Sequence, residues 1–349
     1  MTKSIFITGG SGYIGSTLIA HAIAAGYTIT ALSRTPTSDV KLSSLGATPV
    51  RGDITNLSVL TQEASRADIV ISIADSLAGN FHISKAERFR INNAANDALA
   101  TGLASGDTSG VADGSRKERG TDRCLILTGG TLSSAPDPAG GETDESSPGW
   151  PAGHWADFEL GAISQSWVDA GIRVCTVRLA PYVYGRGGSG VGLFMGMWRK
   201  QGEGMVIDGG KRVSSSVHVD DAVRLYLAVA EKGRAGEICK FSFHAELTGG
   251  IKLIFKTDNA AAENEFTQAQ LAQAICKAIG VPCKSLTYEE AVPKVGEFLA
   301  NFLSVENRAS NRKAREELGW EVKERGILQD IESGSYVEVA QALKEGGAE

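Results

Sequence analysis

Ile5-Phe6-Ile7-Thr8-Gly9-Gly10-Ser11-Gly12-Tyr13-Ile14-Gly15 is the stretch of this sequence that decides the fold. Its apolar start, Ile5–Ile7, predicts a buried strand, and apolar residues recur at helical spacing after the glycines, between Leu18 and Ile23. A strand, a glycine turn and a helix in this order are typical of a loop that binds phosphate. The chain is therefore expected to begin with the first strand–turn–helix unit of an α/β fold.

Three glycines of this turn, Gly9, Gly12 and Gly15, follow a G-x-x-G-x-x-G spacing. The first can adopt backbone angles that are closed to other residues, and the second lets the chain approach a pyrophosphate. The third lets the helix pack closely, and the free N–H groups at the start of the helix face the anion. We therefore predict a dinucleotide site; the alternative is a tight strand–helix turn without a ligand. The residues assigned to this site are Gly9, Gly10, Ser11, Gly12, Tyr13, Ile14 and Gly15.

The second expected strand, Tyr27–Leu32, indicates which dinucleotide is bound. An NAD site usually ends this strand with an acid that accepts a hydrogen bond from the ribose 2′-hydroxyl, but no acid occurs here before Asp39. Ser33 and Arg34 instead offer a hydroxyl and a guanidinium group, which suit a 2′-phosphate. NADP(H) is therefore favoured over NAD(H). The alternative is that Arg34 is a solvated loop cation.

Composition excludes several other classes of protein. The 349 residues are 42% hydrophobic and 22% charged, as in an ordinary globular protein, and suffice for a large core. A net charge of −6 gives no basic field for nucleic acid, and no apolar run is long enough to span a membrane. The five cysteines include no C-x-x-C pair, so neither a disulfide framework nor a metal site is expected. Without a signal peptide, the expected location is cytoplasmic.

Strands and helices alternate along the first half of the chain. Further strands are expected at Ala47–Ile54, Asp68–Ala74, Cys124–Gly130 and Val174–Leu179, and helices at Leu57–Ala64 and Ser84–Leu103. This alternation predicts a Rossmann-type α/β fold with a doubly wound parallel sheet. We expect an NAD(P)-binding domain at residues 1–180, further sheet elements at about 214–245, and a smaller, mostly helical substrate-binding lobe at 181–213 and 246–349.

Ligands of such sheets bind beyond the carboxyl ends of the strands. This rule places Asp53 and Ile54 near the adenine, and it places Ala74 and Thr128 around the same crevice. The alternative for Asp53 is a carboxylate that only forms an Asx turn.

Two segments interrupt this pattern. Residues 105–122 are rich in small and charged residues and predict a disordered surface insertion. Residues 247–264 resemble a linker with a small added strand at 251–255. Later helices are expected from Thr267, at Ala291–Leu303, and at Arg308–Leu318 with Gly319 as the stop.

Six motifs in order make the chain similar to the extended and atypical short-chain dehydrogenase/reductase superfamily, in its NAD(P)-dependent epimerase/dehydratase-like branch. They are Thr8–Gly15, Arg51–Ile54, Asp68–Ala74, Arg178–Gly185, Ser216–Ala222 and Lys313–Trp320. The resemblance covers nearly the whole chain and implies a Rossmann-type fold and an NAD(P) cofactor. It is also compatible with a homodimer, because a paired-helix dimer is common in this superfamily.

The resemblance further implies a catalytic machinery, of which this sequence has only a part. The family uses a Ser or Thr after the fifth strand and a Tyr-x-x-x-Lys on the next helix, where the Tyr passes a proton and the Lys lowers its pKa. Thr128 fills the hydroxyl position, either to orient a carbonyl or to close a strand-end hydrogen bond. No Tyr-x-x-x-Lys follows: the corresponding helix has His154 and Phe158, and no lysine occurs between Lys117 and Lys200.

Other side chains are candidates for the missing proton donor, and each has a structural alternative. His154, with a reference pKa of about 6.5, could relay a proton or could cap the loop–helix junction. Tyr182 and Tyr184 offer phenols, or are pocket walls or core. Asp75 would act as a base or bind a polar substrate, or is a satisfied turn carboxylate. His218 is expected to be a structural hydrogen-bonding residue.

Three functions are compatible with these observations. The first is an NADP(H)-dependent oxidoreductase acting on a carbonyl or alcohol of a small organic molecule, since hydride transfer depends mainly on placing the nicotinamide. The second is a non-redox isomerase, epimerase or dehydratase, and the third is a cofactor-sensing binder. The substrate pocket is expected between the sheet edge and the lobe, bordered by Asp75, Thr128, His154 and Tyr182. Met195, Met197 and Trp198 indicate an apolar wall for a hydrophobic substrate, or else lobe core.

Overall fold

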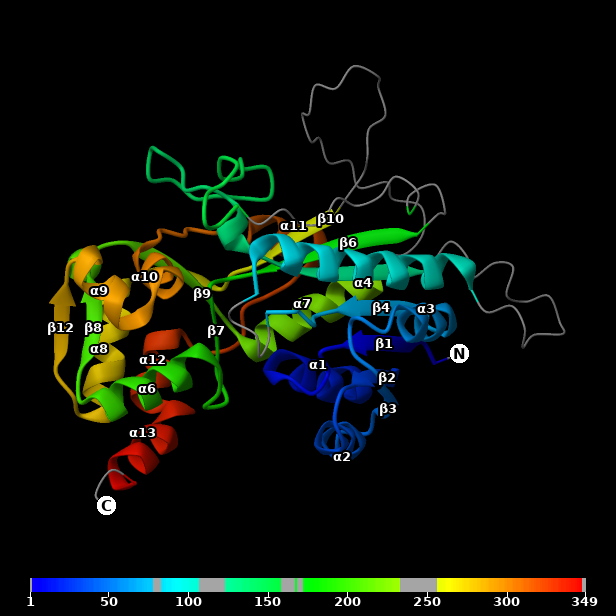
Figure 1. Cartoon of the computed structure of the whole chain (residues 1–349), viewed down its shortest axis with the longest axis horizontal. Coiled ribbons are helices and arrows are strands. Elements are labelled where there is room, and N and C mark those ends of the chain that lie inside the picture. Colours follow the sequence, from blue (N-terminus) through cyan, green and yellow to red (C-terminus); the bar gives the residue numbers. More distant parts are fainter. Residues whose placement is uncertain are drawn as a thin grey trace, which may run out of the picture. The chain divides into compact units, whose positions relative to one another are not determined.

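The computed structural model of the chain describes residues 2–77, 83–106, 123–157, 167, 172–232 and 256–346. Contacts divide the chain into two compact units, each made of segments that are separate in the sequence (Figure 1). The first unit comprises Met1–Gly129, Glu159–Val177 and Val223–Thr257. The second comprises Gly130–Phe158, Arg178–Ala222 and Asp258–Glu349.

The main sheet has seven strands in the order β10-β6-β5-β4-β1-β2-β3. These strands are β1 (Ser4–Thr8), β2 (Thr28–Ser33), β3 (Thr48–Arg51), β4 (Ile69–Ser72), β5 (Cys124–Gly130), β6 (Arg173–Leu179) and β10 (Lys256–Ala260). Strand β1 pairs in parallel with both β2 and β4, β2 with β3, and β4 with β5. The order 3-2-1-4-5-6 within this sheet is that of a Rossmann fold, so the expected fold class is confirmed.

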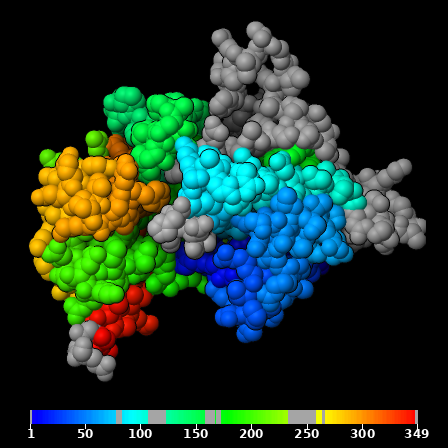
Figure 2. Space-filling view, in the orientation of Figure 1, coloured from blue at the N-terminus to red at the C-terminus, as the bar shows by residue number. Residues whose placement is uncertain are grey.

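Helices cover both faces of the first unit's sheet. They are α1 (Tyr13–Ala24), α2 (Pro36–Ser44), α3 (Leu57–Arg66), α4 (Lys85–Ser105) and α7 (Val219–Lys232). Figure 1 shows α3 and α4 on one side of the sheet and α1 and α2 on the other. Leu60 of α3 and Leu99 of α4 are fully buried in one cluster with Phe6 of β1. The outer face of α4 is visible in cyan at the surface of the unit (Figure 2).

The second unit is mostly helical, as expected. Its helices are α6 (Ser189–Gln201), α8 (Gln268–Ile279), α9 (Tyr288–Val295), α10 (Glu297–Ser304), α11 (Arg312–Leu318), α12 (Ile327–Ser333) and α13 (Tyr336–Glu345). Strands β7 (Tyr182–Tyr184), β9 (Val213–His218) and β11 (Glu263–Thr267) form a three-stranded sheet, and β8 (Gly204–Ile207) pairs with β12 (Cys283–Leu286). Met195 and Trp198 are buried in the core of this unit and Met197 packs against it, so the lobe-core interpretation of these residues is correct.

Helix boundaries in the second unit follow the capping residues closely. Helix α8 begins after Thr267, as expected, with a capping box, and it ends at Gly280 in a left-handed conformation. The prediction of one helix at Ala291–Leu303 was wrong. Gly296, with a φ of 81°, separates α9 from α10 there, and α11 begins at Arg312 rather than at Arg308. The apolar residues keep their helical spacing on both sides of Gly296, so the sequence pattern alone does not reveal that the helix is interrupted there.

Both interruptions of the sequence pattern are only partly covered by the structure. Helix α4 continues to Ser105, and most of the insertion expected at 105–122 lies outside the described residues, as does the small strand expected at 251–255. Within the linker-like segment 247–264, Lys256–Ala260 form an edge strand of the main sheet, and Glu263 begins β11. Among the described residues, no helix is both long and apolar enough to cross a membrane.

Candidate functional site

A cavity of about 530 Å³ opens in the first unit at the carboxyl ends of β1 to β4. This is where a doubly wound sheet binds ligands, because β1 is the strand at which the strand order changes direction. Most residues assigned to the cofactor line it: Gly9, Ser11, Gly12, Tyr13, Ile14, Gly15, Arg34, Asp53, Ile54 and Ala74. Gly10, Ser33 and Thr128 are not among the described residues that do so. The lining also includes Leu32, Thr55, Ile73, Ser76, Ile83 and Ile91, whose apolar or turn-like patterns gave no functional signal.

The three glycines of the turn are required for different reasons. Gly9 has a φ of +77°, and a Cβ on Gly15 would lie 2.2 Å from the carbonyl oxygen of Gly9. The backbone itself therefore demands glycine at both positions. A Cβ on Gly12 would meet one described atom within 4 Å, the Gly9 carbonyl oxygen at 3.2 Å, and would otherwise point into open space. Glycine at position 12 thus keeps space free at the start of α1, which fits the close approach of a diphosphate.

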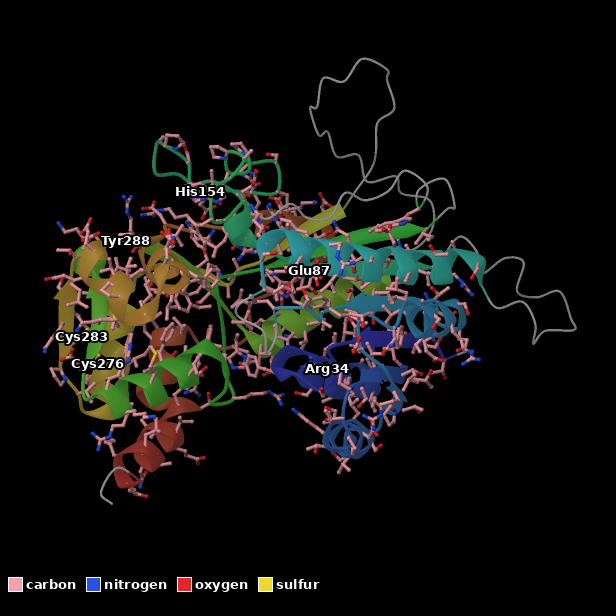
Figure 3. All side chains as sticks on the ribbon, viewed as in Figure 1. Arg34, Glu87, His154, Cys276, Cys283 and Tyr288 are labelled. Carbon is pink, nitrogen blue, oxygen red and sulfur yellow. The ribbon has the colours of Figure 1, made fainter. Side chains whose placement is uncertain are left out.

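The end of β2 carries an exposed guanidinium group, whose charge acts on the nearby carboxylate of Asp53. Ser33 is fully buried, and its hydroxyl donates to the carbonyl oxygen of Thr35 at 3.3 Å. Arg34, which is labelled in Figure 3, is exposed and lines the cavity. Within the part of the chain that the structure describes, it forms no hydrogen bond or ion pair. Asp39, the first acid after this strand, is paired with Arg51 at the end of β3. Arg34 therefore places an exposed positive charge at the cavity.

Asp53 both forms a turn and lines the cavity. Its Oδ1 accepts hydrogen bonds from the Thr55 hydroxyl at 2.6 Å and from the Thr55 amide at 2.7 Å. These bonds, the hydroxyl first, lower the pKa of Asp53 below its usual value, so the side chain is ionised at neutral pH. The Asx-turn alternative is thus correct for Oδ1, and the residue still borders the space expected for the adenine.

Asp75 lines the same cavity but is held firmly by Arg88 of α4. Arg88 Nε and Nη2 donate to it at 2.9 and 2.5 Å, and the Leu77 amide donates at 2.8 Å. Burial would raise the pKa of Asp75, but the hydrogen bonds and charge of Arg88 outweigh it and hold the pKa below its usual value. A carboxylate with a low pKa is a weak base, so this geometry favours the satisfied turn carboxylate.

Thr128, at the end of β5, shares a 2.7 Å hydrogen bond with the phenol of Tyr226 on α7. Tyr226 is fully buried, and burial raises the pKa of its phenol well above its usual value, against a smaller lowering by the bond to Thr128. This contact favours the structural alternative for Thr128, a hydrogen bond that closes the strand end. Sequence reasoning did not single out Tyr226; its one signal is that it is the only aromatic residue of α7.

His154 belongs to the second unit. The prediction that it lies on a helix was wrong, because residues 151–157 form turns and no helix; residues 158–166, which were also assigned to that helix, lie outside the described residues. Its ring stacks on Trp150 with the centroids 3.9 Å apart and the planes 7° apart. Its Nδ1 accepts a hydrogen bond from the Ala156 amide at 3.2 Å. In the neutral ring this leaves the proton on Nε2, which makes that nitrogen a donor.

The remaining candidates are also in the second unit and are engaged within its core. Tyr182 is 3% exposed, its phenol donates to Gln268 Oε1 at 2.7 Å, and burial raises the pKa of Tyr182 well above its usual value. The Tyr184 phenol donates to the carbonyl of Arg325. His218 Nδ1 accepts from the Asp220 amide at 3.2 Å. These contacts favour the core and structural interpretations of all three side chains.

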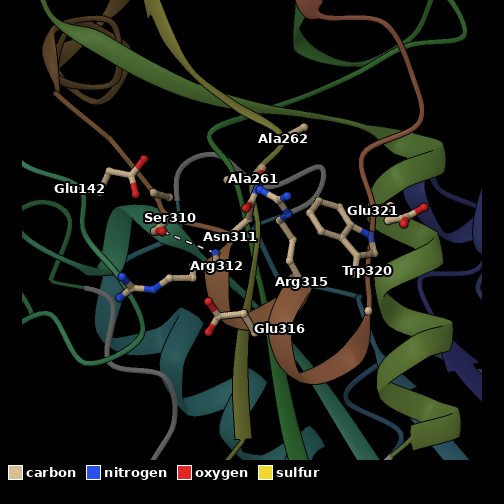
Figure 4. A pocket seen from close by; sticks show the side chains of 12 residues that line it. Glu142, Ala261, Ala262, Ser310, Asn311, Arg312, Arg315, Glu316, Trp320 and Glu321 are labelled. Carbon is tan, nitrogen blue, oxygen red and sulfur yellow. Dashed lines mark hydrogen bonds between the residues drawn. The ribbon is translucent and has the colours of Figure 1, made fainter.

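A second cavity, of about 690 Å³, lies within the second unit around α11 (Figure 4). Its charged lining mixes two guanidinium groups, Arg312 and Arg315, with three carboxylates, Glu142, Glu316 and Glu321. The charges nearly cancel, and none of the residues predicted from the sequence to bind or react lines this cavity. Most of the residues predicted to bind the dinucleotide line the cavity of the first unit, and none of them lines this one.

Comparisons with known proteins agree with a chain that binds a nicotinamide dinucleotide. The sequence model described as the NAD dependent epimerase/dehydratase family matches residues 5–240. A Dictyostelium discoideum protein named sterol-4-alpha-carboxylate 3-dehydrogenase, decarboxylating, is 29% identical over 73% of this chain and 74% of its own length. A ketoreductase from Stigmatella aurantiaca, named for 4-hydroxy-2-methyl-3-oxo-4-farnesyl-3,4-dihydroquinoline-1-oxide, is 26% identical over 90% of this chain and 91% of its own.

Solved structures share the fold at low identity. UDP-glucose 4-epimerase from Thermotoga maritima superposes with a TM-score of 0.69 at 18% identity, covering 97% of this chain and 99% of that one. The human epimerase family protein SDR39U1, solved with NADPH, gives 0.61 at 19% identity and covers 98% of each chain.

Proposed function

Because the chain belongs to the NAD dependent epimerase/dehydratase family, we propose that it is an NADP(H)-dependent oxidoreductase that interconverts a carbonyl and an alcohol of a small, hydrophobic organic molecule. The family and the dehydrogenase and ketoreductase relatives support an NAD(P)-dependent enzyme. The names of these two relatives, one for a sterol and one for a farnesylated quinoline, support the hydrophobic substrate. The observation that carries the cofactor preference is the guanidinium of Arg34 at the cavity, where an NAD site would have an acid.

In this proposal each part of NADP(H) is held by a different part of the cavity. The turn around Gly12 and the first N–H groups of α1 would hold the diphosphate, and Arg34 would hold the 2′-phosphate. Asp53 and Ile54 would border the adenine, which leaves the Ala74 end of the cavity for the nicotinamide. When bound, the cofactor supplies a hydride for carbonyl reduction. We assign the accompanying proton to Nε2–H of His154, since Nδ1 is occupied as an acceptor.

A non-redox reaction with the same cofactor is the second candidate. The family model bears the names of epimerases and dehydratases, and the sequence has no Tyr-x-x-x-Lys to serve the usual proton transfer. A cofactor-sensing binder without turnover is the third.

The test is to follow nicotinamide absorbance and organic product together, for NADPH and NADH, against a panel of hydrophobic ketones and aldehydes. We expect at least one member of the panel to be reduced, with one NADPH consumed for each molecule of product. The same reaction should be slower with NADH. Arg34→Met should remove the preference for NADPH while leaving the rate with NADH nearly unchanged. Product without net change of cofactor would establish the second candidate, and binding of NADPH without any product would favour the third.

A further inference from the structure

Two cysteines meet in the second unit, and neither of them lines either of the cavities described above. Cys276 lies in the last turn of α8, and Cys283 is the first residue of β12 (Figure 3). Their side chains share a hydrogen bond, and both are free thiols. Cys276 is 2% exposed, whereas Cys283 is half-buried, so of the two only Cys283 presents surface to solvent.

Gly204 of β8 makes room for this contact. It is directly opposite Cys283 in the parallel pairing of β8 with β12, so a side chain at position 204 would point to the same face as that of Cys283. A Cβ added to Gly204 would overlap the Sγ of Cys276 and would lie 2.7 Å from Cε3 of Trp198. The sulfur of Cys276 therefore occupies the place of the missing side chain, beside Cys283.

The chain between the two cysteines is fixed by hydrogen bonds of its backbone. At the end of α8, the amide of Val281 donates to the carbonyl oxygen of Cys276 at 3.0 Å. Directly before β12, the carbonyl oxygen of Pro282 accepts from the amide of Gly204 at 2.9 Å. The backbone thus holds the two thiols together, whichever way the neighbouring surface side chains turn.

The shared hydrogen bond gives the two thiols different roles. It raises the pKa of Cys276, as burial also does, so this thiol keeps its proton. The same bond lowers the pKa of Cys283 below its usual value, against a smaller opposing effect of burial. Cys276 therefore stabilises a thiolate on Cys283, and the thiolate is the form of cysteine that reacts with oxidants.

Cys124 and Cys175 provide an internal comparison. Their sulfurs are 4.0 Å apart on the neighbouring strands β5 and β6. Both side chains are at most 1% exposed, and burial raises the pKa of Cys124 well above its usual value. This second pair has the contact between sulfurs but lacks an accessible thiolate, so it should resist oxidation.

We propose that Cys276 and Cys283 form a dithiol that reacts with peroxide and closes to a reversible disulfide between α8 and β12. The Cys283 thiolate attacks one oxygen of hydrogen peroxide, the O–O bond breaks, and the leaving hydroxide takes up a proton to become water. Cys283 is then a sulfenic acid. The sulfur of Cys276 attacks the sulfur of Cys283, the S–O bond breaks, and the hydroxyl group leaves as water with the proton of Cys276. Both thiols are oxidised and the peroxide is reduced to water, without any part for the cofactor of the proposed function.

The experiment is a peptide map of the full chain after treatment with a small molar excess of hydrogen peroxide and alkylation of the remaining thiols. Lys277 lies between the two cysteines, so trypsin separates them into peptides 257–277 and 278–284 unless a disulfide joins these. We expect the joined pair in wild type, and dithiothreitol should release it. Cys283 should be oxidised at least about 10-fold faster than Cys124 or Cys175, whose peptides 124–173 and 174–178 should stay separate.

Two serine variants test the order of the steps. In Cys276→Ser the sulfenic acid of Cys283 finds no second thiol, so dimedone should trap it there. In Cys283→Ser no dimedone adduct should form on Cys276. Cys239→Ser is the matched control: this cysteine lies outside the described residues, and its loss should leave the joined peptides unchanged.

Wild type in which peptides 257–277 and 278–284 stay separate while peroxide oxidises other cysteines would overturn the inference. Equal oxidation of the Cys124–Cys175 pair would also overturn it, because accessibility would then not select the site. A joined pair that disappears in Cys239→Ser, or an adduct on Cys276 in Cys283→Ser, would contradict direct attack by Cys283. None of these results bears on NADPH binding, so the proposed function would stand or fall separately.

Discussion

Gly12 and Gly15 provide a paired test of the cofactor cavity, because only one of them is required by the chain itself. Gly12 has a φ of −74° and a ψ of −179°, a conformation that alanine adopts without strain. Its new Cβ would make one slightly tight contact, at 3.2 Å. The reduced entropy of the unfolded chain favours alanine by about 0.4–1 kcal/mol, and the poorer N-cap preference of alanine opposes this by a similar amount. We expect Gly12→Ala to change the free energy of unfolding by less than about 1 kcal/mol.

The effect of Gly12→Ala on cofactor affinity should be much larger. The methyl group would enter the space beside the first N–H groups of α1, where we place the diphosphate. Losing one charge-assisted hydrogen bond there corresponds to about 1.5–3 kcal/mol, or roughly a 10- to 100-fold weaker NADPH complex. Gly15→Ala differs, since its Cβ would lie 2.2 Å from the Gly9 carbonyl oxygen and 2.7 Å from the Gly10 Cα. Rigid backbone must move there, so a cost of about 1–3 kcal/mol to folding is expected.

Differential scanning calorimetry and NADPH titration on both variants measure the two effects separately. Gly12→Ala should keep its Tm within about 3 °C of wild type and lose affinity, whereas Gly15→Ala should lose both. Gly12→Ala with wild-type Tm and wild-type affinity would refute the argument, because the space beside Gly12 would then have no function in binding.

Other variants test the contacts around the site. Arg88→Met removes the partner of Asp75, and partial exposure of the pair limits the expected destabilisation to about 1–2 kcal/mol at neutral pH. Because the folded-state pKa of Asp75 is lowered, this difference should begin to shrink once the pH falls below about 4, the usual pKa of an aspartate, and should be lost as the pH passes the lowered folded-state value. Chemical denaturation that gives a pH-independent difference would contradict it. His154→Ala should reduce turnover at least about 10-fold without changing NADPH affinity; full activity would exclude it as proton donor. Tyr226→Phe should lower the free energy of unfolding by about 1 kcal/mol through loss of the Thr128 bond, with cofactor affinity unchanged, and weaker NADPH binding would show that the pair belongs to the site.

The sequence predicted the sheet, and it predicted most of the residues that border the cavity at the strand ends, because both follow from local patterns. β-branched runs such as Asp68–Ala74 and the spaced glycines of Gly9–Gly15 have few alternative structures, and parallel pairing then brings the strand ends together. The same logic pointed to Arg34, which directly follows β2, and to Asp53, which lies two residues after the end of β3.

What the sequence could not show are contacts between side chains far apart along the chain. Nothing local indicates that Lys41 reaches Ser11, 30 positions away, or that Thr128 meets Tyr226, 98 positions away. Asp75 is an example. Its position after a strand predicts a functional carboxylate, but the structure shows that Arg88 donates hydrogen bonds to both of its carboxylate oxygens. The break at Gly296 was missed for a different reason, since apolar spacing does not record the sign of φ.

The central claim is that the cavity bordered by Gly12 and Arg34 holds NADP(H). Calorimetric titration of the wild-type chain with NADPH, NADP⁺, NADH and NAD⁺ tests it most directly. We expect saturable binding of one dinucleotide per chain, with both 2′-phosphorylated forms bound more tightly than their counterparts. Absence of heat and of saturation with all four nicotinamide dinucleotides would contradict it.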